Sequence, residues 1–368
     1  VIGALRHFLP GHLATRPVLA PGQWRAVHAI LHCRTPAMGG HVYACRDCGE
    51  THFAWHSCNH KACPQCGGDA TAKWVARQLD RRVNAPHFLV TFTLPDEMRE
   101  IFLGRMAKDA FGIFFKAVAG AMEHALGSPK SMGAATVGFT SVLHTWNQQL
   151  LFHPHIHCIV PGAGLDANGK LLKVKDPQFL VPLPILRSAF RRAFRAGMEE
   201  HQWQVDPAVW RKDWGVHVQP CGDGSSAVKY LGTYVAKTAI GDHRILAVDD
   251  TTVSFRWTDR AHGNARKVMT VTGTEFVRRY LRHALPKGLR AIRYHGFHHP
   301  AAKKTRERVR FHSGMPLVIG SAVTAAAPPR PGYLCPCCGK EMGKTMRIPR
   351  PPRHIAIQPR GPPKPCAA

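Results

Sequence analysis

Three histidines recur at alternate positions in the stretch LLFHPHIHCIV, residues 150–160. A β-strand points successive side chains to opposite faces, so His155 and His157 share one face and lie about 7 Å apart along the strand. Two imidazoles in this arrangement can bind one divalent cation, although a hydrogen-bonded pair inside a core would show the same pattern. His153 has the same parity, but Pro154 is expected at the first position of a strand, so His153 ranks below the other two.

Two tyrosines and a lysine occupy one side of a predicted helix in the stretch VKYLGTYVAK, residues 228–237. At 100° per residue, Tyr230, Tyr234 and Lys237 lie opposite an apolar stripe that would face the core. That stripe consists of Val228, Leu231, Val235 and Ala239. The alternative is a solvated face whose tyrosines pack against a neighbouring strand. We take Tyr230, Tyr234 and Lys237 as candidate catalytic residues.

Together these side chains predict chemistry on a phosphodiester. A tyrosine hydroxyl can attack phosphorus and form a covalent phosphotyrosine. A cation held by histidines can polarise the scissile phosphate, and a lysine can stabilise its developing charge. The energy of the broken phosphodiester bond is kept in the phosphotyrosine linkage. A second tyrosine one helical turn away can therefore attack another DNA strand without water taking part. Such a pair is suited to strand transfer rather than to hydrolysis.

A second group of possible metal ligands lies near the N-terminus, where six of the twelve cysteines fall between positions 33 and 66. Cys45-x2-Cys48 and Cys63-x2-Cys66 are two knuckles, and four thiolates in two such turns can close a tetrahedral zinc site. We expect this zinc to be structural, because the four sulfurs leave no position for water.

Further possible ligands surround these knuckles and remain unassigned. They could form a second site, replace a member of the first, or be ordinary loop residues; they are Cys33, His41, His52, His56, Cys58 and His60. Of these we retain Cys58 and His41 as candidate zinc ligands. The stretch CPCCGK at 335–340 is half a knuckle with no obvious second half, so we expect no metal there.

The charge balance predicts a polyanionic partner. Fifty Lys and Arg against 23 Asp and Glu give a formal net charge of +27, which indicates nucleic acid. No apolar run reaches the roughly 18 residues of a membrane span, and no basic amphipathic helix has a strong aromatic face. Arg6, His7 and Pro10 interrupt the apolar N-terminal stretch, unlike a secretory signal. We therefore expect a cytoplasmic protein with no membrane partner; the sequence identifies no protein partner.

Sequence periodicity predicts the elements that would position these residues. Strands are expected at 87–95, 134–146, 150–160, 214–220, 251–258 and 266–272, with a hairpin turn at Asn168-Gly169. Helices are expected at 70–83, 96–127, 185–201, 227–240 and 273–288. Ser225 or Ser226 is expected to cap the helix at 227–240, and Thr274 the helix at 273–288. Strands and helices alternate irregularly, which predicts an α+β fold with helices packed on an antiparallel sheet.

Several stretches resemble one family of proteins. HPHIHCIVPGAGL and KYLGTYVAKTAIGDHRIL are similar to the His-hydrophobic-His and two-tyrosine motifs of the bacterial rolling-circle transposases of the IS91 family. GGHVYACRDCG and HSCNHKACPQC resemble that family's zinc-binding domain, and FTLPDEMR, LHTWNQQL and EFVRRYLRHALPKGLRAIRYHGF resemble its other characteristic stretches. The resemblance is scattered from about residue 30 to 300.

The resemblance implies a single-strand DNA endonuclease and strand transferase that uses Mg²⁺ or Mn²⁺. It implies an HUH endonuclease fold, a ferredoxin-like antiparallel sheet with the histidine strand central, preceded by a small domain that binds Zn²⁺. The family's metal ligands map onto His155 and His157, and its tyrosines onto Tyr230 and Tyr234. A third metal ligand is usual in such enzymes, and the candidates are Gln148, Gln149 and His153.

The chain is thus expected to act as an insertion-sequence transposase on single-stranded element ends and target DNA, in the bacterial cytoplasm and at the nucleoid. The expected organisation is a helical segment at 1–32, a zinc-binding domain at 33–70, a catalytic domain at 71–300, and a basic, Pro-rich, largely disordered tail at 301–368. Two alternatives remain open. One is a rolling-circle replication initiator or relaxase, and the other is a zinc-dependent DNA-binding protein without nuclease activity.

Overall fold

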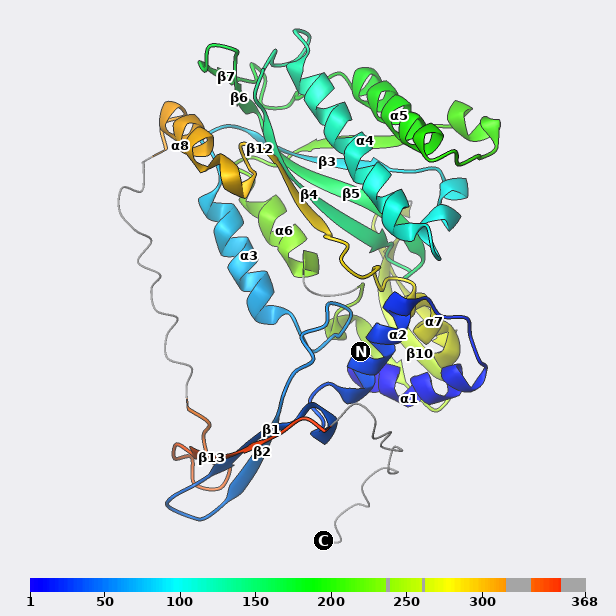
Figure 1. Ribbon diagram of the computed structural model, residues 1–368, viewed down its shortest axis with the longest axis vertical. Coiled ribbons are helices and arrows are strands. Elements are labelled where there is room, and N and C mark those ends of the chain that lie inside the picture. The colour runs from blue at the N-terminus through cyan, green and yellow to red at the C-terminus, as the bar shows by residue number, and fades with distance from the viewer. Residues whose placement is uncertain (236–238, 260–261, 316–331, 352–368) are drawn as a thin grey trace.

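A five-stranded antiparallel sheet organises the computed structural model (Figure 1). The structure describes residues 1–235, 239–259, 262–315 and 332–351. The strand order is β12 (Ile292–Gly296), β4 (Gly138–Trp146), β5 (Phe152–Pro161), β3 (His87–Thr93) and β8 (Gly215–Pro220). All neighbouring pairs run antiparallel. The predicted histidine strand, β5, is therefore the central strand, with hydrogen-bonded partners on both edges.

One face of this sheet carries the main hydrophobic core. Two long helices cover it, α4 (Ala107–Gly127) and α5 (Leu183–Glu200) (Figure 1). Alternation along β3 places Phe88 and Phe92 in this core, as the sequence predicts. Phe114 of α4 is fully buried there, with rings of Phe190 and Phe194 within 6.2 Å of its own. Large aromatic side chains thus fix both helices to the sheet, which leaves the opposite face for the histidines.

The opposite face carries a smaller core and two other helices, α3 (Gly68–Asp80) and α6 (Ser225–Val235) (Figure 1). Val228 and Leu231 of α6 pack on Trp74 of α3, as the predicted apolar stripe requires. Val142 of β4 and Ile159 of β5 complete this core from below. The helix α6 therefore lies directly over the face of β5 that holds His155 and His157.

The N-terminal helices belong to a second unit. Helices α1 (Ile2–Ala14) and α2 (Pro21–His32) share a core with α7 (Gly273–Leu281) and with a three-stranded sheet. The order of that sheet is β11 (Ala265–Thr272), β10 (Thr252–Asp259) and β9 (Ile245–Val248). Leu5, Ile30, Phe255 and Phe276 meet in this core. The expected boundaries of a 1–32 segment and a 71–300 domain therefore cut through one packed unit.

A narrow ribbon forms a third part of the molecule (Figure 1, lower part). Its strands are β13 (Gly343–Ile348), β1 (Gly40–Ala44) and β2 (Thr51–Trp55), in that order. In the register, Gly40 lies opposite both Ile348 and Trp55. Strands from the two ends of the chain thus lie side by side, an arrangement that no local sequence pattern predicts.

The expectation of a largely disordered tail from 301 to 368 is wrong for two described segments. Helix α8 (Lys303–His312) buries Val309 beside Phe297 and Leu165, and β13 pairs with β1. Both segments are stabilised by contacts with distant parts of the chain, so their own basic composition gives no sign of them.

Other boundaries also shift from their predicted positions. The Asn168-Gly169 turn is confirmed between β6 (Ala163–Leu165) and β7 (Leu171–Lys173), with φ +79° at Gly169. The helix expected at 96–127 begins as two short 3-10 turns, and α4 proper starts only at Ala107. The cap of α7 is Thr272, whose side chain accepts from Glu275 N, rather than Thr274. No helix in the described ranges is long and apolar enough to cross a membrane.

Candidate functional site

Three imidazoles converge on the face of the sheet beneath α6. His155 and His157 come from β5, and His144 comes from the neighbouring strand β4, where it lies opposite His155 in the register. Their candidate ligand nitrogens all lie within 4.8 Å of one another. The ring of His157 lies 4.8 Å from each of the other two rings, centroid to centroid. This spacing allows the three side chains to share one cation.

Hydrogen bonds orient two of these rings. Nδ1 of His157 lies 2.8 Å from Oγ1 of Thr91 on β3. Nδ1 of His155 lies 2.7 Å from the backbone carbonyl oxygen of His153, to which it can donate. Partners of this kind on the second ring nitrogen commonly fix the orientation and tautomer of metal-binding histidines. They make Nε2 the candidate ligand atom of each ring.

His144 was not among the residues predicted for this site. It is buried, and burial, followed by the neighbouring His157 and His155, lowers the pKa of His144 well below its usual value. The imidazole is therefore neutral at physiological pH, which is the form that binds metals. The sequence places His144 on a predicted strand, within the stretch LHTW. Only the pairing of that strand with β5 brings the side chain to the site.

The earlier candidates for a third ligand are His153, Gln148 and Gln149, and all three line the same cavity as the histidine cluster. His153 lies outside the group of three, and Nη2 of Arg99 lies 2.8 Å from its Nδ1. Nη1 of Arg279 donates to the backbone carbonyl of Gln149 at 2.9 Å, which holds this loop in place.

Tyr230 of α6 reaches the histidines. Its ring lies 6.3 Å from that of His157 in an edge-on arrangement, and the residue is 38% exposed. The hydroxyl-bearing ring is thus both next to the cluster and open to a substrate. Tyr234 lies one turn further along α6, but its side chain is outside what the structure describes. Lys237 is also outside the described residues, and the described helix ends before it at Val235.

A cavity of about 420 Å³ opens beside this cluster. The three histidines and Tyr230 line it together with two tryptophans, Trp146 and Trp257. The Trp146 ring stacks on His144 with centroids 5.0 Å apart. Nζ of Lys267 lies 5.6 Å from the Trp257 ring and 2.7 Å from Oδ2 of Asp259, so its charge is paired with a carboxylate. Flat aromatic surfaces beside three histidines that could hold a cation suit a ligand that has both bases and phosphates.

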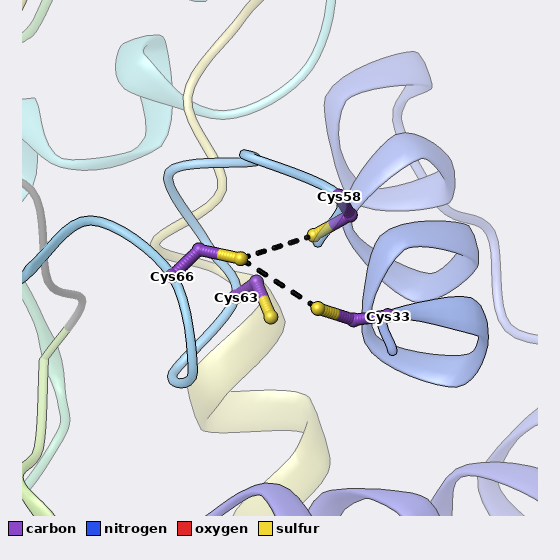
Figure 2. A group of neighbouring side chains, drawn as sticks. All are labelled: Cys33, Cys58, Cys63 and Cys66. Carbon is purple, nitrogen blue, oxygen red and sulfur yellow. Dashed lines mark hydrogen bonds between the residues drawn. The ribbon is translucent and has the colours of Figure 1, made fainter. Parts of the chain in front are cut away.

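The cysteines form two separate groups, so the predicted single site of Cys45, Cys48, Cys63 and Cys66 is wrong. The first group contains Cys33, Cys58, Cys63 and Cys66. Figure 2 shows the sulfurs of Cys33 and Cys58 both directed towards that of Cys66. The Cys66 sulfur lies 3.6 Å from that of Cys33 and 3.7 Å from that of Cys58. A tetrahedron of thiolates around zinc has edges of about 3.8 Å.

The second group joins Cys45 and Cys48 to Cys335 and Cys338. The half-knuckle at 335–340 therefore has its second half at the other end of the chain. Backbone N–H groups of Cys48 and Asp47 lower the pKa of the Cys45 thiol to about 7, which favours the thiolate. His41 lies in neither group, and its ring instead meets the edges of Tyr43 and His56.

Comparisons with known proteins match two families. Residues 5–94 match a family described as "Transposase zinc-binding domain". Residues 138–306 match a family described as "Putative transposase". The three histidines and Tyr230 lie within the second range, and the first cysteine group lies within the first. Cys335 and Cys338 lie outside both ranges.

Two relatives align with most of the chain. A Sinorhizobium fredii protein named "Putative transposase y4qJ" is 36% identical over 318 residues, which cover 81% of this chain and 79% of the relative. The "Transposase for insertion sequence element IS801" of Pseudomonas savastanoi pv. phaseolicola is 27% identical over 307 residues, covering 78% of this chain and 72% of the relative. No solved structure matches the chain significantly.

Proposed function

The chain belongs to the IS91 family of insertion-sequence transposases, and from this premise we propose that it cuts and joins single-stranded DNA at its element ends through a tyrosine nucleophile. The observation that carries the proposal is the position of Tyr230, which extends from α6 to the rim of a cavity lined by His144, His155 and His157. The antiparallel sheet with these histidines on its central strands supports an HUH endonuclease fold.

In the proposed reaction, the Tyr230 oxygen attacks the scissile phosphorus. A bond forms between this oxygen and phosphorus, and the bond from phosphorus to the 3′ oxygen breaks. The phenol loses its proton, and the departing 3′ oxygen gains one. The product is a 5′-phosphotyrosine and a free 3′-OH. Attack by another 3′-OH on that phosphotyrosine reverses these changes and joins a new strand. Tyr234 follows Tyr230 by four residues, one turn of α6, and is proposed as the second nucleophile.

The three histidines are proposed to hold a divalent cation. Burial keeps His144 neutral, and Thr91 and the backbone of β5 fix His157 and His155, so the donor set fits a metal ion. Mg²⁺ prefers oxygen ligands, which makes Mn²⁺ the better fit to imidazoles. When bound, such an ion would stabilise the negative charge that develops on the phosphate.

Single-stranded DNA is the proposed substrate because the cavity walls offer stacking surfaces. Trp146 and Trp257 can stack on unpaired bases, and each such contact typically contributes about 1–3 kcal/mol. The net charge of +27 supports binding to the phosphate backbone. Bases paired in a duplex would not be available to these rings.

The first cysteine group is proposed to hold the zinc ion of the N-terminal domain. Cys33 lies at the end of α2, and the other three ligands lie in the loop that follows β2. Four thiolates leave no open position, so this ion would be structural. It would stabilise the conformation of the loop that follows β2. The Ala62 carbonyl of this loop accepts a hydrogen bond from the buried Tyr280 hydroxyl.

The proposal predicts a covalent adduct between the full chain and single-stranded DNA from the element ends. The DNA should be labelled at its 3′ end, because the protein would be attached to the fragment downstream of the cut. With Mn²⁺, a denaturing gel should show label that migrates with the protein, and a chelator should prevent this. A 5′ label should instead appear on a shortened free strand.

Duplex DNA of the same sequence provides the control and should give no adduct. If folded protein binds these single strands but forms no adduct with any end sequence, the protein binds DNA without nuclease activity. That outcome would reject the proposed reaction.

Thr91 provides a test of the cation site that does not depend on DNA. Thr91→Val removes the hydroxyl beside His157 Nδ1 with little change in shape. Loss of such a supporting hydrogen bond should weaken Mn²⁺ binding by about 10–100-fold, measured by titration calorimetry. Thr91→Ser keeps the hydroxyl and should bind nearly as tightly as the wild type. Equal affinity in the valine variant would show that Thr91 does not position a metal ligand.

A further inference from the structure

Two short segments from opposite ends of the chain have the same turn. They are CRDCGE at 45–50 and CPCCGK at 335–340. In each, the glycine N–H donates to the carbonyl of the first cysteine, at 3.1 Å for Gly49 and 2.9 Å for Gly339. Both glycines have a positive φ, +76° and +71°, which other residues rarely adopt. The two segments are thus matched knuckles, each able to direct two thiolates at one ion.

The sulfurs of these knuckles meet in one group. The Cys45 and Cys338 sulfurs lie 3.5 Å apart, and those of Cys48 and Cys335 also lie 3.5 Å apart. All four lie within 4.8 Å of one another. A disulfide would bring two sulfurs to about 2.05 Å, whereas four sulfurs at these separations approximate the tetrahedron that zinc requires. Cys337 lies in the same turn but outside the group, exposed to solvent.

Contacts around the knuckles hold the two segments together. The Tyr43 and Tyr333 rings stack with centroids 4.7 Å apart, and Lys340 Nζ lies 2.9 Å from Asp47 Oδ1. The buried cluster between the segments is small, and it consists of Cys45, Cys335 and Met342 in the described part of the chain. A core of this size cannot maintain three strands without an additional crosslink.

We propose that a second zinc ion, bound by Cys45, Cys48, Cys335 and Cys338, joins the two ends of the chain into one zinc ribbon. Cys45 and Cys48 lie inside the range matched by the zinc-binding family, whereas Cys335 and Cys338 lie outside both matched ranges, so the complete site extends beyond the matched domain. The zinc would supply the folding free energy that the small ribbon core lacks. The C-terminal segment from 332 to 351 then becomes part of the N-terminal domain. The proposal is independent of the reaction at Tyr230.

Alkylation of the wild-type protein tests this site without any substitution. Cys48, Cys337 and Cys338 are all exposed in the structure, so solvent access alone would make them react alike. In the zinc-loaded full chain, iodoacetamide should label Cys337 rapidly and leave Cys48 and Cys338 protected, as read by peptide mass spectrometry. After zinc is removed with a chelator, all three should be labelled. Labelling of Cys48 and Cys338 as fast as Cys337 in the zinc-loaded chain would overturn the proposal.

Metal content provides a second and independent measurement. Cys335→Ser with Cys338→Ser should lower the zinc content by one equivalent per chain relative to the wild type, measured by elemental analysis. Cys337→Ser is the matched control, because it changes a cysteine of the same turn that lies outside the group, and it should lose none. The comparison with wild type removes any contribution from zinc at other sites. A double variant that retains the wild-type content would reject the site.

Discussion

Tyr230→Phe is expected to abolish the covalent protein–DNA adduct. The substitution removes only the oxygen that would bond to phosphorus, and the ring that packs edge-on against His157 remains. No other atom of the variant can replace this oxygen at the same position, so the loss should be complete rather than partial. The adduct is measured with 3′-labelled single-stranded DNA and Mn²⁺ on a denaturing gel. DNA affinity, measured by fluorescence anisotropy, should be unchanged.

Tyr333→Phe is the matched control for this experiment. Tyr333 is 42% exposed, close to the 38% of Tyr230, but it lies on the ribbon with the Tyr43 ring. The same loss of one oxygen there should leave the adduct intact. Tyr234→Phe should still form the first adduct and should impair later strand transfer and transposition. A wild-type level of adduct from Tyr230→Phe would instead assign the first cut to Tyr234.

The parts of the site that rest on local periodicity could be predicted from the sequence. Alternation along β5 separates His155 and His157 from Ile156 and Cys158, which lie in the core with α4 and α5. The apolar stripe of α6 likewise placed Tyr230 away from Leu231 on the helix. In both elements a side chain's direction follows from the backbone of a few neighbouring residues, so a single sequence contains enough information.

The parts that depend on pairing between distant segments could not be predicted. His144 joins the cluster only through the register of β4 on β5, which no single strand specifies. The knuckle turns were recognisable, but the choice of partner was not, because Cys45 meets a cysteine 293 positions away. A zinc site that combines Cys45 and Cys48 with the nearest knuckle in the sequence, Cys63 and Cys66, is therefore wrong. The pairing of β13 with β1 and the packing of α1 on α7 also join distant segments, so local sequence patterns do not predict them.

His155→Ala is expected to lower DNA cleavage by about a thousandfold and to leave DNA binding intact. A metal ion at a scissile phosphate typically supplies several kcal/mol of charge stabilisation, and each factor of ten in rate corresponds to about 1.4 kcal/mol. The two remaining imidazoles, His144 and His157, should bind Mn²⁺ more weakly. Cleavage rate, Mn²⁺ affinity and DNA affinity are measured on the same preparation, and the zinc content should match that of the wild type.

His153→Ala is the matched control, because it makes the same change two residues earlier on the same face of β5. His153 contacts Arg99 and lies outside the group of three histidines, so this variant should keep the Mn²⁺ affinity of the wild type. A general loss of strand packing would affect both variants, whereas loss of a metal ligand affects only His155→Ala. If His155→Ala lost DNA binding together with cleavage, His155 would be a structural residue, and the cation site would have to be assigned elsewhere.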